Sequence, residues 1–196
     1  MKTTNSKEIK KLALLALLTA MVAILAYFGG FIKIGSLASI SLTLIPIVIG
    51  AALHGPWAGA WLGFVSAVVF FTTADAAFWF GLSIPGTVIT VIVKGVLAGL
   101  LAGIVYNLLK NKNRYLAVIT SAIVCPVVNT GIFLGGCFVF FLDTVKSAAA
   151  GEGMSLFSYI IIFYVGLNFV FELIANLVLA PTIYRLLNIK KKNFDE

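Results

Sequence analysis

Four polar side chains recur at four-residue intervals in the last apolar stretch of the sequence: Tyr164, Asn168, Glu172 and Asn176. Residues four apart lie on the same side of an α-helix, so the spacing places all four on one helical face. An ionisable group at the centre of a membrane helix costs about 2.5–3.5 kcal/mol on insertion scales, so such groups turn inward and find partners. We therefore expect Glu172 to face the interior of a helical bundle.

A lone lysine, Lys94, lies within the apolar run VIVKGVLAGLLAG at residues 91–103. Thr90 and Thr87 precede it by four and seven residues, on about the same helical face. At 1.5 Å per residue, Lys94 lies roughly 13 Å from the outer end of its helix. Asn129, in the next apolar stretch, is expected at a comparable depth.

These polar groups have two interpretations, which are compatible with each other. In the first, Lys94 and Glu172 form a structural ion pair and the asparagines join helices by hydrogen bonds. In the second, they line a water-accessible cavity that opens outward. Its predicted lining is Lys94, Asn129, Asn168 and Glu172, with Trp79 and Tyr164 offering aromatic faces.

One cation, one anion, several amides and aromatic rings suit a small polar organic molecule. A single carboxylate is too few for a dedicated metal site, and with one histidine in the chain a Cys/His metal site is not expected. The two cysteines, Cys125 and Cys137, are about 18 Å apart along one helix and are assigned to packing.

Enzyme and ATPase signatures are absent from the sequence. It contains no GxSxG, no HExxH and no GxxxxGK[ST] motif. The single histidine, His54, falls in a predicted cytoplasmic turn, remote from Lys94 and Glu172. We therefore expect a protein that is not an enzyme and carries no cofactor, so that any use of ATP requires a partner.

The composition defines the elements that must position these residues. Hydrophobic residues make up 61% of the 196 and charged residues 11%, whereas a soluble domain averages about 25% charged. A spanning helix needs about 20 apolar residues. We expect one all-α integral membrane domain over residues 1–196, a compact bundle of six transmembrane helices at about 9–28, 42–54, 56–74, 85–110, 115–142 and 156–188. The segments after 74 and after 142 are read as a connection and a polar loop.

The basic residues predict the topology. The chain carries a net charge of +7, and eleven of its fourteen Lys and Arg residues flank apolar blocks in three clusters near the two ends and residues 110–114. Six spans place all three clusters on one side, which the positive-inside rule assigns to the cytoplasm together with both termini. The same distribution argues against a nucleic-acid surface.

Small residues recur along the faces of three expected helices. Ala13, Ala16, Ala20 and Ala23 form a seam on the first one, and glycines repeat every four residues at 55–63 and 95–103. Such ridges let helices approach closely in lipid. We expect the glycines to pack within the bundle. For the alanine seam, an external partner helix is nearly as good an explanation.

These patterns resemble the substrate-binding S components of energy-coupling factor (ECF) transporters. ALLTA at 16–20 matches an A-x-x-x-A motif of that family. The segment SLTLIPIVIGAALHGPWAGAWLG resembles its second and third helices, and PVVNTGIFLGG and ELIANLVLAP resemble the group that includes pantothenate and related subunits. The resemblance covers nearly the whole chain and rests on the order of the patterns along it.

The resemblance implies a multi-pass subunit of a bacterial cell membrane that binds a water-soluble vitamin or precursor from outside. It implies docking through Ala16 and Ala20 on a transmembrane coupling subunit, with two ATPase subunits supplying energy. The connection that carries Lys33 is interpreted as a gate to the site. Lys94 suits a carboxylate such as pantothenate, which is the ligand we favour. Glu172 suits a cationic or hydroxyl-rich ligand such as a B6 vitamer. The alternatives are a self-sufficient carrier or channel and a structural membrane protein.

Overall fold

The computed structural model describes residues 2–29, 33–34, 38–39, 42–162 and 167–195. Within these ranges the regular secondary structure is helical apart from one short strand pair, in which β1 (Lys33–Ile34) runs antiparallel to β2 (Ala38–Ser39). The expected all-helical class is confirmed. The helices are α1 (Lys2–Gly29), α2 (Leu44–His54), α3 (Pro56–Phe70), α4 (Ala74–Leu82), α5 (Ile84–Leu109), α6 (Arg114–Phe140), α7 (Leu142–Gly151), α8 (Leu156–Tyr159) and α9 (Leu167–Asp195).

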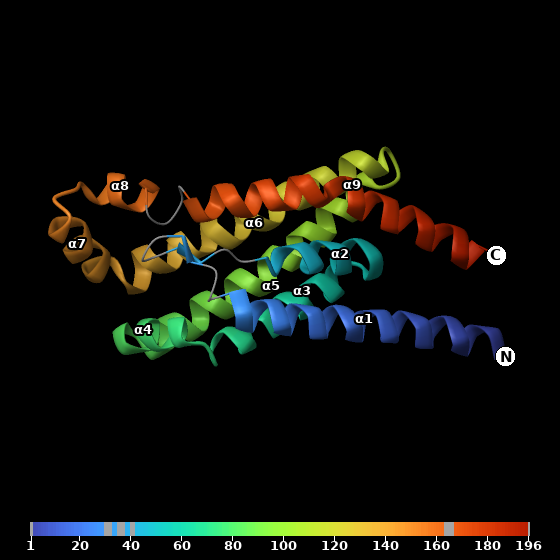
Figure 1. The fold of residues 1–196 in the computed structure, drawn as a ribbon, viewed down its shortest axis with the longest axis horizontal. Coiled ribbons are helices and arrows are strands. Elements are labelled where there is room, and N and C mark those ends of the chain that lie inside the picture. The colour runs from blue at the N-terminus through green and yellow to red at the C-terminus, as the bar shows by residue number, and fades with distance from the viewer. Residues whose placement is uncertain (1, 30–32, 35–37, 40–41, 163–166, 196) are drawn as a thin grey trace.

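The long helices lie side by side as an elongated bundle, with α4, α7 and α8 at one end and both chain termini at the other (Figure 1). Three helices are long and apolar enough to cross a membrane, namely α5, α6 and the Glu8–Gly29 part of α1. If the bent pair α3 and α4 counts as one span, the number of candidate spans rises to four. The helix α2 is apolar but shorter. These numbers hold for the described ranges, in which the expected set of six is not established.

Two segments expected to lack helical structure are helical. The third helix, expected to reach residue 74, ends at Phe70, and the chain bends by 83° into α4. Thr72 and Thr73 cause the break, because each hydroxyl donates a hydrogen bond to a backbone carbonyl three residues earlier. Thr73 then takes an extended conformation and begins the new helix.

The expected polar loop after residue 142 forms α7. Its residues Val145 and Ala149, four apart, are both buried, so the segment is amphipathic despite its charged residues. Asp143 lies in the first turn, where a carboxylate interacts favourably with the helix dipole. The predicted sixth helix, 156–188, is described as α8 and α9, while residues 163–166 between them lie outside the described residues.

The helices α3 and α5 are in backbone contact along their glycines. A Cβ atom added at Gly59 would overlap the backbone of Gly99, and one added at Gly63 would overlap that of Gly95. Only residues without side chains allow this approach. The expectation that these glycines pack within the bundle is confirmed.

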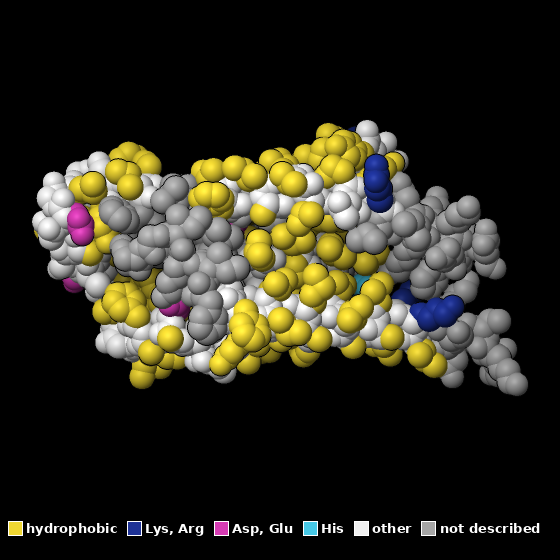
Figure 2. Space-filling view, viewed as in Figure 1, with side chains coloured by type: hydrophobic (Ala, Val, Ile, Leu, Met, Phe, Trp, Pro, Cys, Tyr) yellow, Lys and Arg dark blue, Asp and Glu magenta, His cyan; other side chains and the backbone are white. Residues whose placement is uncertain are grey.

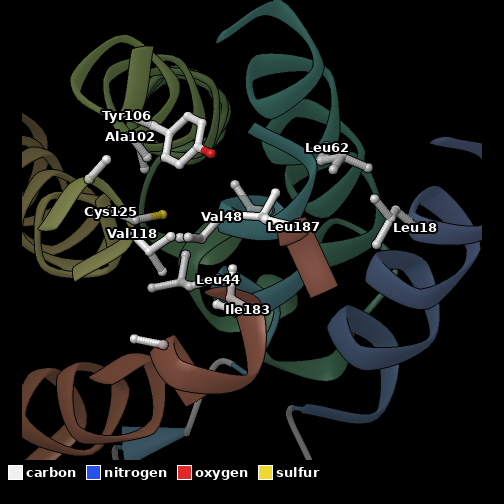
Figure 3. Packing of buried hydrophobic residues seen from close by; sticks show 14 of the residues in the cluster. Leu18, Leu44, Val48, Leu62, Ala102, Tyr106, Val118, Cys125, Ile183 and Leu187 are labelled. Atoms are coloured by element: carbon white, nitrogen blue, oxygen red, sulfur yellow. The ribbon is translucent and has the colours of Figure 1, made fainter. Parts of the chain in front are cut away.

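The buried apolar side chains form two separate clusters. The larger, which we call the inner cluster, includes Leu18, Leu62, Ala98, Cys125 and Ala180 and draws on α1, α2, α3, α5, α6 and α9 (Figure 3). The smaller, the outer cluster, includes Cys137, Phe141, Val145 and Tyr159, at the end occupied by α7 and α8. Cys125 and Cys137 are both buried and free, as their assignment to packing predicts.

Candidate functional site

Polar side chains occupy the helical turns between the two apolar clusters. On α5, Thr90 and Lys94 precede Ala98, which belongs to the inner cluster; on α9, Glu172 and Asn176 precede Ala180, which belongs to it as well. On α6, Asn129 lies between Cys125 of the inner cluster and Cys137 of the outer cluster. We call Thr90, Lys94, Asn129, Glu172 and Asn176 the polar layer.

Lys94 lies against aromatic rings. Its Nζ is 5.0 Å from the ring centroid of Phe133 on α6 and 5.8 Å from that of Phe70 at the end of α3. An ammonium group over a ring face gains about 0.5–1 kcal/mol when exposed and about 2 kcal/mol when desolvated. These two rings therefore fix the position of the cation.

Lys94 and Glu172 interact electrostatically across the bundle, from α5 to α9. Among the described residues, every carboxylate oxygen is more than 4.0 Å from Lys94 Nζ, which is too far for an ion pair. The two charges therefore interact, but the direct ion pair of the structural interpretation is not formed among the described residues. Glu172 is only 2% exposed, while Lys94 is half-buried.

Two further groups in the layer are deeply buried with unused hydrogen-bonding capacity. Asn176 is 1% exposed and its Nδ2 donates to the backbone oxygen of Glu172 at 2.9 Å. Its Oδ1 and the Oγ1 of Thr90 have no hydrogen-bond partner within the part of the chain that is described. An unsatisfied buried polar group costs about 1–3 kcal/mol. Such a cost is typical of sites where a ligand or water completes the bonding.

Trp79 joins the layer through Phe133. The two rings are 5.4 Å apart and nearly perpendicular, and the Trp79 ring also lies 5.2 Å from that of Phe141. The backbone of α4 is held here by Thr87, whose hydroxyl lies 2.8 Å from the carbonyl oxygens of Trp79 and Ser83. The outer end of the polar layer is therefore bordered by aromatic rings.

The predicted site residues are placed unevenly. Lys94 and Glu172 interact electrostatically, Trp79 lies next to Phe133, one of the two rings against Lys94, and Asn129 is half-buried on α6. Tyr164 lies outside the described residues. Only the backbone is described for Lys33, which pairs with Ser39, and for Asn168 in α9.

Sequence reasoning missed the two rings that hold Lys94. Phe133 follows Asn129 by four residues, and this spacing alone places it on the same helical face. Phe70 carried no such signal, since its position depends on where α3 ends. Thr90 and Asn176 were recognised by their spacing but were not included among the predicted lining residues.

The predicted docking residues lie on the outside of the bundle. Ala16 and Ala20 are both exposed on α1, and so is Ala13 in the same seam. Large apolar side chains such as Leu17 and Ile24 are also exposed, at 63% and 58%. The outward face of α1 is thus apolar and interrupted by a row of small residues.

The arrangement suits binding better than catalysis or metal coordination. Within the described ranges, no group of three or more His, Cys, Asp and Glu side chains is placed to hold a metal ion. The layer offers one ammonium, one carboxylate, amides, a hydroxyl and ring faces. These are the groups that bind and orient a small polar molecule.

The comparisons with known proteins agree with this chemistry. A sequence model described as "ECF transporter, substrate-specific component" matches residues 10–184. No curated protein and no solved structure matched the chain. The matched range includes the whole polar layer and the alanine seam.

Proposed function

The chain belongs to the family of ECF transporter substrate-specific components, and from this premise we propose that it captures a water-soluble vitamin or vitamin precursor outside the cell. Members of this family are substrate-binding subunits of importers. The bound molecule is delivered inward when the subunit docks on a transmembrane coupling protein and two ATPase subunits. The energy comes from ATP bound by those partners, and this chain carries no cofactor.

The polar layer is the observation that carries this proposal. A protein that only filled space in the membrane would gain by replacing Lys94, Glu172 and Asn176 with apolar residues, because each is costly to bury. The layer instead lies between two apolar clusters, with charged and amide groups contributed by three different helices and with Lys94 and Glu172 interacting across the bundle. A ligand site explains why those groups are kept there.

The distribution of charge supports a cytoplasmic position for both termini. Exposed basic residues, among them Lys112 and Arg185, gather at the end of the bundle where the chain begins and ends. Asp143 lies in the first turn of α7 and Glu152 directly after its last residue, and Figure 2 shows acidic side chains at that opposite end. By the positive-inside rule the terminal end faces the cytoplasm of a bacterial cell membrane. Six spans, with the layer open to the outside, fit this orientation.

Docking is proposed for the exposed seam on α1. Ala16 and Ala20 are small exposed side chains among larger ones, and such a row of small residues lets a helix of the coupling subunit approach closely. For the ligand we favour pantothenate, whose carboxylate suits Lys94 and whose hydroxyl and amide groups suit the remaining members of the layer.

The test is mass spectrometry of small molecules released from the chain purified in detergent, followed by titration with each molecule found. A stoichiometric vitamin supports the proposal and identifies the substrate. A protein that is empty and binds no vitamin from a B-vitamin panel contradicts it. Uptake by liposomes that contain this chain alone would instead establish a self-sufficient carrier.

A further inference from the structure

Resting on the proposed function, we infer that the polar layer selects anionic ligands: a small carboxylate that also carries a hydroxyl or amide group. Lys94 binds the carboxylate, Thr90, one helical turn before it on α5, binds the uncharged polar group, and Phe70 and Phe133 are positioning residues for the ammonium. This excludes the cationic class of ligand that the carboxylate of Glu172 alone would suit.

The surroundings of the two charges decide the sign. Glu172 is 2% exposed and lies within the helix packing. The Lys94 ammonium lies against two ring faces and forms no ion pair among the described residues, so it is the charge that can take a counter-ion. A cationic ligand at this place would be repelled by the Lys94 ammonium.

Phe70 and Phe133, which we call the aromatic cage, keep the Lys94 ammonium available for a ligand. Ring faces attract a cation without neutralising it, since they carry no net charge. The ammonium makes no ion pair within 4.0 Å among the described residues, so it still has hydrogens to donate. A ligand carboxylate supplies the missing acceptor in a place of low dielectric constant, where such a bond is strong.

Thr90 completes the recognition. It is more than nine-tenths buried, and its Oγ1 has no hydrogen-bond partner among the described residues. The backbone of Gly136 on α6 lies close against the Thr90 side chain and holds it in place. A ligand with a hydroxyl or amide group satisfies this atom, and a purely apolar acid does not.

The experiment compares matched pairs that differ only in the carboxylate. Calorimetric titrations would use pantothenate against pantothenol, biotin against biotinol and nicotinate against nicotinamide, with thiamine and pyridoxamine as cationic probes. For the pair that binds, we expect the acid to bind about 10- to 100-fold more tightly, the range of a charge-assisted hydrogen bond. Lys94→Met should abolish that preference, and Lys94→Arg should keep most of it.

The controls separate this inference from the proposed function. Lys146→Met removes an exposed lysine on α7 and should change neither affinity nor preference. Thermal unfolding checks that Lys94→Met is folded. If it is not, the preference of the wild type and of Lys94→Arg for the acid over its neutral analogue still tests the inference. Tight binding of a cationic or neutral vitamin would overturn the inference and leave the proposed function standing. Binding of no probe would overturn both.

Discussion

The backbone of Gly63 in α3 lies directly against the backbone of Gly95 in α5, one residue after Lys94. This contact fixes the height of Lys94 relative to α3, and with it the distance from the ammonium to Phe70 at the end of that helix. The glycines therefore do more than bring two helices together. They set the geometry of the aromatic cage.

Gly63→Ala should destabilise the fold. Its added Cβ atom would overlap the carbonyl group of Gly95, and overpacking of this kind costs about 1–3 kcal/mol. Gly135→Ala on α6 is the matched control, because a Cβ atom there meets nothing within 4 Å. Helix propensity predicts that this control is neutral or more stable by about 0.5–1 kcal/mol. Unfolding in detergent by heat or denaturant measures both, and equal stabilities would contradict the role of the contact.

Much of this arrangement follows from spacing in the sequence. The glycine ridges and the shared face of Glu172 and Asn176 are regularities of four residues, and the structure places them as a helix requires. The bend after Phe70 is not a regularity of that kind. It depends on two threonine hydroxyls competing for backbone carbonyls, and many sequences containing paired threonines remain helical.

The site was therefore only partly predictable. The electrostatic interaction of Lys94 with Glu172 was expected from depth and charge, whereas the absence of a direct ion pair among the described residues and the contact of the ammonium with two rings were not. Phe70 reaches Lys94 because α3 stops there, so its role depends on a tertiary feature. Helix α7 was missed because its charged residues outweighed its short buried face of Val145 and Ala149.

The two buried threonines of α5 should respond in opposite ways to valine. Thr87→Val removes a hydroxyl that bonds to backbone carbonyls and should cost about 0.5–1.5 kcal/mol of stability. Thr90→Val removes a hydroxyl without a described partner and should leave stability unchanged or raise it, while ligand affinity falls by about 2- to 10-fold. Paired unfolding and binding curves test this. Normal ligand affinity in Thr90→Val would show that the Thr90 hydroxyl does not contact the ligand.

Phe133 should act on ligand binding through the position of Lys94. Phe133→Leu removes a cation–π contact of about 0.5–2 kcal/mol and should weaken binding of an acid several-fold. Phe133→Tyr keeps the ring face and should bind the acid about as tightly as the wild type. A purely apolar packing role would not predict this difference between the leucine and tyrosine variants. Phe138→Leu, at a 49% exposed position on the same helix, is the control. Equal binding by the leucine and tyrosine variants would contradict the cage.

The α1 seam should matter for transport and not for binding. Enlarging the exposed Ala16 and Ala20 to leucine prevents the close approach of a partner helix, so we expect the variant to bind ligand normally and fail to co-purify with the coupling and ATPase subunits. Leu17→Phe adds bulk at an exposed position beside the seam and should have a smaller effect. Undiminished co-purification of the double variant would show that docking uses another face.

The fluorescence of Trp79 tests the location of the ligand most directly. Its ring contacts Phe133, which holds the Lys94 ammonium, while Trp57 and Trp61 are exposed on α3. A variant that keeps only Trp79, with phenylalanine at the other two positions, would be titrated with the vitamin released from the purified protein. If the ligand occupies the polar layer, the Trp79 emission changes and saturates at the calorimetric affinity, and Lys94→Met abolishes the change. Saturable binding that leaves Trp79 emission unaltered and survives Lys94→Met would contradict a site in the polar layer.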